Sequence, residues 1–256
     1  MTPNQSGPDV SIPRRLQPYL MELKFQGSAA AGAFRSLESK LADRRALAAE
    51  FRRASREEYV PPLEQEQQAF AQRYIAPLGN TTGPILGEVQ SFLAATGVIA
   101  SIFWPSQRPF HGESAAAVST RVHRGGELKQ LLDVRDDSIL RVRTGGREDA
   151  RGGFLHFDEM IDEFTRERRH GTFVSFDIGS EAEGTAMRRP NAIRWLDEDT
   201  LQLWVKGREA NLRDTKNELE RVLGKITSNA TVRFVRDSSG RHRPSSFGMS
   251  FGTDLR

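Results

Sequence analysis

The stretch Ser28–Tyr59, SAAAGAFRSLESKLADRRALAAEFRRASREEY, decides the fold of the N-terminal half of the chain. It is rich in Ala, Leu, Arg and Glu. Its large apolar residues recur near the spacing of a helix and share one face, and they include Phe34, Leu37, Leu41 and Phe51. Pro61 and Pro62 follow and disfavour helical backbone in the residues before them. The stretch therefore predicts one long amphipathic helix.

Two helical segments are predicted after this helix. Residues 63–76 continue the helical pattern as far as Pro77, and the sequence LGNTTGP at 78–84 predicts a turn. The segment Ile85–Trp104 is strongly apolar. Its most apolar run, Phe92–Trp104, is shorter than the ~20 residues that a bilayer-spanning helix needs, so we expect a buried core helix and no membrane contact.

The pattern changes after Gly171 from helical to strand-like. Thr172–Ile178 predicts a strand, and Ala192–Leu196 and Leu201–Val205 flank a polar turn typical of a hairpin. Trp195 and Trp204 would then share one face of the sheet. Asn211–Ile226 returns to a helical pattern.

These segments predict a mainly α protein with a helical bundle and a small C-terminal α/β appendage of a hairpin plus a helix. The predicted division is a disordered arm at 1–13, a helical domain at 14–170, an α/β module at 171–236 and a flexible tail at 237–256.

Composition excludes several classes of function. The 256 residues include no cysteine, and the five histidines never occur at the spacing of three or four that places two ligands on one helix face, so no metal is expected. The N-terminus has no apolar segment typical of a secretory signal, which favours a cytoplasmic location. A net charge of +3 neither requires nor excludes nucleic acid. The sequence has no phosphate-binding loop and no Gly-x-Ser-x-Gly motif.

The segment 149–164, DARGGFLHFDEMIDEF, holds the candidate chemistry. In a helix, its apolar stripe is Ala150, Phe154, Phe157, Ile161 and Phe164. His156 lies off this stripe, on a second face with Leu155 and Met160. A helix with two such faces packs in its own bundle and also meets a partner. Arg151 can swing its long side chain toward the same face.

Arg151, four intervening residues and His156 resemble the Arg-x4-6-His motif of HEPN-domain proteins, a superfamily rich in ribonuclease toxins and defence effectors. The resemblance covers about residues 14–170 in architecture and only these few residues in motif. It implies a metal-independent endoribonuclease of toxin or antiviral-defence type, with no cofactor, in which Arg151 and His156 are catalytic. It also implies a homodimer, because in the family two protomers bring their Arg and His pairs into one composite site.

The chemistry that this resemblance implies needs no metal. An imidazole with a pKa near 6.5 can take the proton of an RNA 2′-hydroxyl and return one to the leaving 5′-oxygen. Guanidinium groups can hold the phosphate and stabilise the charge that develops on it. The product would be a 2′,3′-cyclic phosphate. DNA would not be cleaved, because it lacks the attacking 2′-hydroxyl.

Several other charged residues could contact RNA. Arg141, Arg143 and Arg147 precede the motif and are the predicted RNA-binding residues. Arg121, His123 and Arg124, expected in a loop before a short helix at 127–134, are a second possible phosphate grip, with plain surface charge as the alternative. The acidic run at Asp158, Glu159, Asp162 and Glu163 is typical of a solvated helix face.

Two further functional classes stay open. Active members of the family usually carry Asn, Asp or His directly after the motif arginine, where this chain has Gly152. The same helix face could therefore belong to a catalytically inactive interaction module that binds a partner protein of a defence or toxin–antitoxin complex. A DNA-binding accessory protein would rest on the Arg-rich tail alone.

Overall fold

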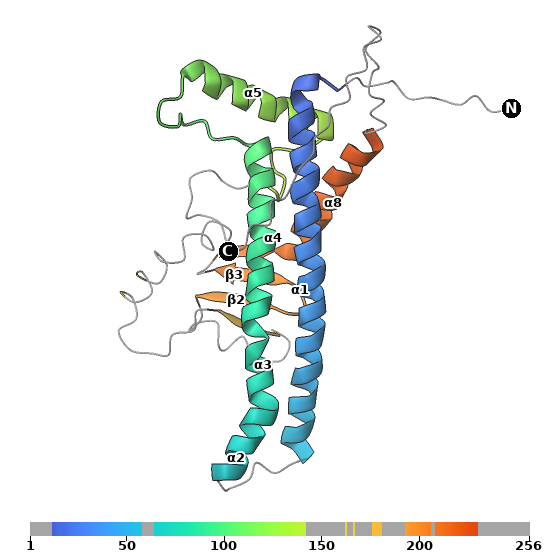
Figure 1. Ribbon diagram of the computed structural model, residues 1–256, viewed down its shortest axis with the longest axis vertical. Coiled ribbons are helices and arrows are strands. Elements are labelled where there is room, and N and C mark those ends of the chain that lie inside the picture. Colours follow the sequence, from blue (N-terminus) through green and yellow to red (C-terminus); the bar gives the residue numbers. More distant parts are fainter. Residues whose placement is uncertain are drawn as a thin grey trace, which may run out of the picture.

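Two long antiparallel helices form the axis of the molecule (Figure 1). The computed structural model describes residues 12–57, 64–141, 162, 166, 176–180, 193–205 and 208–229. A short 3₁₀ turn, η1 (Arg14–Leu16), leads into α1 (Gln17–Glu57), which has 41 residues. The opposing helical stretch consists of α2 (Glu64–Phe70), a π-turn η2 (Ala71–Ile75), α3 (Ala76–Asn80) and α4 (Thr82–Phe103). The long predicted helix is confirmed, although it begins at Gln17, before Ser28.

The seam between α1 and α4 follows a heptad pattern. The buried residues of α1 recur at alternating intervals of three and four, and the facing residues of α4 do the same. They are Leu20, Leu23, Gly27, Ala30, Phe34, Leu37 and Leu41 on α1, and Ile85, Val89, Phe92, Thr96, Ile99 and Phe103 on α4. The rings of Phe34 and Phe92 lie 5.5 Å apart at the middle of this seam. The prediction of a buried apolar helix at 85–104 is confirmed.

The predicted turn at 78–84 is wrong, because the helical path continues almost unbroken through this segment. Only Thr81 leaves the helix, and its hydroxyl donates to the Leu78 carbonyl at 2.7 Å. Pro77 and Pro84 lie in the first turns of α3 and α4, where a proline costs no hydrogen bond because the backbone N–H has no partner within the helix. The glycines and prolines that suggested a loop therefore fit consecutive helix starts.

The helical stretch Glu66–Phe103 is also long and apolar enough to cross a membrane by length and composition, with a mean hydropathy of 1.5 over its most apolar window. Half of that window is buried inside the protein. One face of this helix packs against α1, whose charged residues Lys24, Arg35 and Glu38 are exposed.

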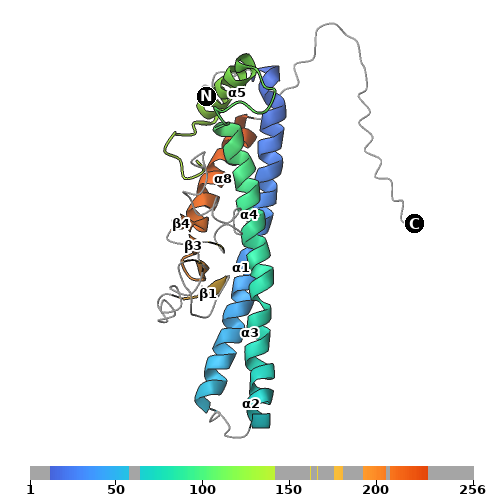
Figure 2. The ribbon, with the colours of Figure 1, turned by 90° about the vertical axis from the view of Figure 1, so that its left-hand side faces the viewer.

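The C-terminal part adds a small sheet and a helix to one side of the long helices (Figures 1 and 2). Its strands lie in the order β1 (Asp177–Gly179), β2 (Arg194–Asp197), β3 (Gln202–Val205) and β4 (Arg208–Asn211). β1 is parallel to β2, and the other pairs are antiparallel. The predicted hairpin is confirmed, with Trp195 paired to Trp204 and their ring centroids 4.6 Å apart. Strand β4 was not predicted.

The last helix, α8 (Leu212–Asn229), confirms the prediction at 211–226 and packs against α1. The Asn211 side chain caps its start by accepting from the Asp214 amide at 2.9 Å. Gly27 allows a close approach, because a Cβ atom there would lie 2.4 Å from Leu223 Cδ1. One cluster of buried residues runs from Leu16 to Ile226, so the sheet and α8 share the core of the long helices.

Candidate functional site

The predicted catalytic pair, Arg151 and His156, lies outside the described residues, as do Arg143 and Arg147. Arg141 is described and is exposed. Its Nη1 donates to the carbonyl of Asp136 at 2.9 Å, and its amide donates to the Ser138 carbonyl at 2.9 Å. Arg141 therefore helps to shape the loop after α5 (Ala115–Leu132), which lies across one end of the long helices (Figure 1).

The second group of residues expected to bind phosphate makes structural contacts instead. Arg121, His123 and Arg124 lie on α5, so the predicted loop is wrong. The helix predicted at 127–134 is the end of a longer helix, because Ser114 caps a helix that begins at Ala115 and ends at Leu132. The Arg121 guanidinium donates to Ser106 O at 2.8 Å, Arg108 O at 2.5 Å and the Glu113 carboxylate. These donors are committed to the loop 104–114, so Arg121 is not available to a phosphate.

The two neighbours of Arg121 differ in exposure. Arg124 Nη1 donates to the Tyr19 hydroxyl at 2.8 Å, and its guanidinium lies 4.1 Å from the centre of that ring. The His123 side chain is 76% exposed and lies 3.4 Å from Glu127. Arg124 thus joins α5 to α1, and the three residues do not converge on one ligand.

Arg44 joins the long helices to the sheet. Its Nη1 donates to Leu78 O and to Thr81 Oγ1, each at 2.9 Å, and its Nη2 donates to Ile178 O at 3.1 Å. Nε lies 3.8 Å from the Glu198 carboxylate, and both side chains are nearly buried, at 12% and 9% exposure. This arrangement satisfies backbone carbonyls where the helical path breaks at Thr81, and it fixes the sheet against α1.

The tryptophan pair is part of the sheet packing. Trp195 is 2% exposed, so it cannot stack on a base, and Trp204 donates from Nε1 to Glu209 at 2.7 Å. The two rings lie on one face of the sheet, as predicted.

The surface most suited to a partner lies where the two long helices extend past the sheet (Figures 1 and 2). We define the distal hairpin as residues 42–57 of α1 with residues 64–80 opposite. Its apolar seam is only half-buried, and Ala54 is the sole fully buried residue among those whose burial is described there. The half-buried members are Leu47, Phe51, Phe70, Tyr74 and Leu78.

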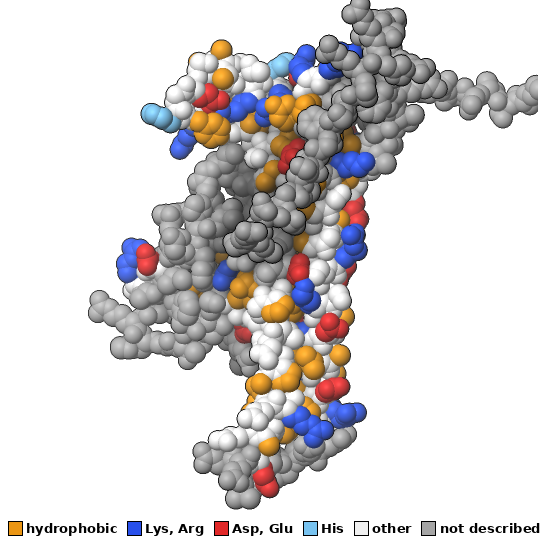
Figure 3. Space-filling model, in the orientation of Figure 1, with side chains coloured by type: hydrophobic (Ala, Val, Ile, Leu, Met, Phe, Trp, Pro, Cys, Tyr) orange, Lys and Arg blue, Asp and Glu red, His pale blue; other side chains and the backbone are white. Residues whose placement is uncertain are grey.

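The aromatic residues of this seam form a short ladder. Phe51 and Phe70 have ring centroids 6.0 Å apart, and Phe70 and Tyr74 are 4.9 Å apart. Ile75 beside them is 51% exposed. Figure 3 shows hydrophobic side chains gathered on the lower half of this face. The part of the α1–α4 seam nearer the start of α1 is fully buried, so the two parts of the seam differ in burial.

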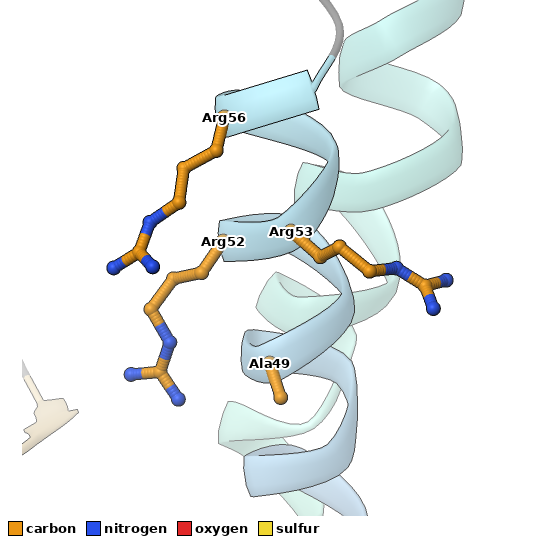
Figure 4. Close-up of a pocket in the computed structure, with 4 residues that line it drawn as sticks. All are labelled: Ala49, Arg52, Arg53 and Arg56. Carbon is orange, nitrogen blue, oxygen red and sulfur yellow. The ribbon is translucent and has the colours of Figure 1, made fainter.

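Three arginines project from the last turns of α1. Arg52, Arg53 and Arg56 line an open hollow of about 300 Å³ together with Ala49. Figure 4 shows Arg52 and Arg56 extended from one side of α1, with Arg53 pointing to the other side. Arginines in the last turns of a helix also complement its negative end. The sequence signal for this cluster is the spacing of one, three and four residues between the arginines.

The charges of the distal hairpin are mixed. Residues 42–57 and 64–80 together hold six basic and five acidic residues. This near balance is unlike the basic surface that binds nucleic acid. Among the described residues, no group of three or more His, Asp or Glu side chains could hold a metal ion.

The chain matches no known protein family, no curated protein and no solved structure.

Proposed function

We propose that this chain is an interaction module whose distal hairpin docks an amphipathic helix of a partner protein. The half-exposed aromatic seam of Phe51, Phe70 and Tyr74 carries the proposal. A two-helix seam can bury only part of each large side chain, and a third helix lying along the groove would complete the burial. Burial of apolar surface contributes about 25 cal/mol per Å², so aromatic side chains are strong anchors for such a helix.

The arginines indicate the charge that the partner helix should carry. Arg52, Arg53 and Arg56 project from α1 close to the distal seam. A partner with acidic residues beside its apolar stripe is therefore favoured over a basic one. Carboxylates pair well with guanidinium groups, often through two hydrogen bonds.

Cross-linking from one position tests this proposal. A photoreactive amino acid replaces Ile75 in the full chain, and a matched variant carries it at Ser91, which is exposed on the same helical stretch outside the distal hairpin. We expect a discrete protein product from position 75 in cells, attached through a peptide that is apolar on one face and acidic beside it. Arg52→Glu with Arg56→Glu should weaken that product. Yields equal to those at position 91, or products with only nucleic acid or a second copy, would overturn the proposal.

A second candidate function, a metal-independent endoribonuclease, rests on the spacing of Arg151 and His156. In this hypothesis His156 exchanges protons with the 2′-hydroxyl and the leaving oxygen, and Arg151 stabilises the phosphate. Arg141, Arg143 and Arg147 would guide RNA to the pair from the N-terminal side. Incubation of the purified chain with total RNA and transfer RNA in EDTA, followed by end-group analysis, distinguishes the candidates. Discrete fragments with 2′,3′-cyclic ends support the enzyme.

A further inference from the structure

The face of α1 that points away from α4 carries two exposed large apolar side chains. Met21 is 74% exposed and Phe25 is 67% exposed, the highest values among the large hydrophobic residues described. They lie one helical turn apart, on the side opposite the buried residues Leu23 and Ala30. Exposed apolar residues that adjoin in this way mark interaction surfaces more often than isolated ones do.

The same face has a heptad pattern of its own. Pro18, Phe25, Gly32 and Ser39 follow at intervals of seven, and we call this row the outer face of α1. Pro18, Phe25 and Ser39 are exposed, and a Cβ atom added at Gly32 would meet nothing within 4 Å. This row therefore presents one large side chain, Phe25, and, two turns later, an open space on the helix at Gly32.

We propose that α1 pairs antiparallel with α1 of a second copy through the outer face, with the two-fold axis between Ser28 and Ala29. This register places Phe25 of each copy on Gly32 of the other, so the largest side chain fills the space that the glycine leaves. The two contacts are related by symmetry, as an interface between identical subunits requires. Small residues at the centre of such a pairing let the two helices approach closely.

Charge supports the antiparallel direction. The same register brings Arg14 of one copy opposite Asp43 of the other, and both residues are exposed. A parallel pairing would instead place Arg14 beside Arg14 and Gly32 beside Gly32, which combines like-charge repulsion with a gap. The pairing is independent of the distal hairpin proposal, because it uses a different face of α1.

Two single-cysteine variants separate this arrangement from the alternatives, because the natural chain contains no cysteine. Position 28 lies beside the two-fold axis, so Ser28→Cys should cross-link two copies with a short bis-maleimide. Ser39→Cys should not, because the antiparallel register separates its two copies by roughly 30 Å at 1.5 Å per residue. Both serines are exposed on α1. Cross-linking at both positions would indicate a parallel pair and would overturn the proposal. Cross-linking at neither position, or only at position 39, would overturn it as well.

The mass of the full chain gives a second measurement. Light scattering at micromolar concentration should report a dimer, which Phe25→Glu converts to a monomer with an unchanged circular dichroism spectrum. Gly87→Glu is the matched control, because Gly87 is also a helical glycine with nothing within 4 Å, on α4. Arg14→Asp and Asp43→Arg should each weaken the dimer, and the double variant should restore it. A monomeric natural chain, or equal effects of Phe25→Glu and Gly87→Glu, would contradict the pairing.

Discussion

Adjacent glycines of α5 differ in what surrounds them, and this difference sets opposite effects of the same substitution. A Cβ atom at Gly125 would lie 2.7 Å from the Phe103 carbonyl oxygen, which belongs to the backbone, and 2.7 Å from Pro105 Cδ. A Cβ atom at Gly126 would meet nothing within 4 Å. Alanine is favoured over glycine inside a helix by about 1 kcal/mol.

We therefore expect Gly126→Ala to raise the free energy of unfolding by roughly 0.5–1 kcal/mol, and Gly125→Ala to lower it by roughly 1–3 kcal/mol. Urea denaturation of both variants at neutral pH measures the two changes. A stabilising Gly125→Ala would show that α5 does not press against the end of α4.

Glu88 supplies a pH-dependent contact between the long helices. It accepts hydrogen bonds from Lys40 and from Ser36 Oγ, the latter at 2.8 Å, and these contacts lower the pKa of its carboxyl below the ordinary value. A lowered pKa in the folded state means that the stabilisation is complete above the unfolded pKa of about 4.3 and is lost as the pH falls through the folded pKa.

Glu88→Gln should therefore cost about 1 kcal/mol at pH 7, a typical value for one hydrogen-bonded, partly buried pair. The difference between the natural chain and this variant should shrink as the pH falls below about 4. Urea midpoints measured across that range for both proteins give the difference directly. A gap that stays constant with pH would mean that the charge on Glu88 contributes nothing.

At the scale of residues, the sequence predicted which apolar side chains are buried. It did not predict which groups the polar side chains contact. The spacing of Phe34, Leu37 and Leu41 predicted the buried face of α1 correctly, because helical periodicity is local. The role of Arg121 could not be predicted, since its partners Ser106, Arg108 and Glu113 become neighbours only when the loop folds back on α5.

At the scale of elements, polar contacts of Arg44 join the two long helices to the sheet. Replacing Arg44 by Met keeps most of the apolar stem but removes the guanidinium that lies beside the nearly buried Glu198 carboxylate. The carbonyls of Leu78 and Ile178 also lose a donor. Breaking a buried ion pair by removing one partner typically costs 3–5 kcal/mol, and the remaining exposure of this pair reduces the expected cost to roughly 2–3 kcal/mol.

The neighbour Arg45 provides the control for this substitution. It is exposed and donates to the Glu198 carbonyl at 3.2 Å, so Arg45→Met should cost less than about 1 kcal/mol. Adding Glu198→Gln to Arg44→Met should recover part of the loss in a double-mutant cycle. Equal losses of unfolding free energy for the two arginine variants would show that the Arg44 contacts stabilise the fold no more than those of Arg45.

Sequence patterns predicted the elements better than their ends. The hairpin of β2 and β3 and the helix α8 were predicted within a few residues, because turn residues and amphipathic spacing lie within each segment. The segment 78–84 was mistaken for a turn, since proline and glycine in a first helical turn look the same in sequence as in a loop. The distal hairpin's exposed seam was also missed, because exposure depends on where the sheet ends.

At the scale of the whole molecule, the shared core joins parts that the sequence suggested were separate modules. Buried residues of η1, α1, α4, α5, the sheet and α8 belong to one cluster. The predicted mainly helical architecture with a small C-terminal sheet and helix is confirmed. The predicted Arg and His pair lies outside the described residues, so its role is a question for enzymology.

The ribonuclease hypothesis makes the sharpest whole-molecule prediction. His156→Ala and Arg151→Ala should each abolish RNA cleavage in EDTA, while the chain keeps its oligomeric state and melting temperature. General acid–base catalysis contributes about 10²- to 10⁴-fold, so a catalytic histidine should show a loss of that order. Gly152→Asn, toward the family's pattern, should preserve or raise the rate. DNA of the same sequence should stay intact, because it has no 2′-hydroxyl to attack the phosphate.

His123→Ala is the matched control for these variants, because the His123 side chain is 76% exposed on α5 and lies outside the motif. It should cleave RNA at the rate of the natural chain if cleavage belongs to the motif. Equal rates for His156→Ala and the natural chain would remove the catalytic assignment, and unfolding of His156→Ala would give this histidine a structural role. Intact RNA with the natural chain, together with a discrete cross-link from position 75, would leave the interaction module as the function that accounts for the exposed seam.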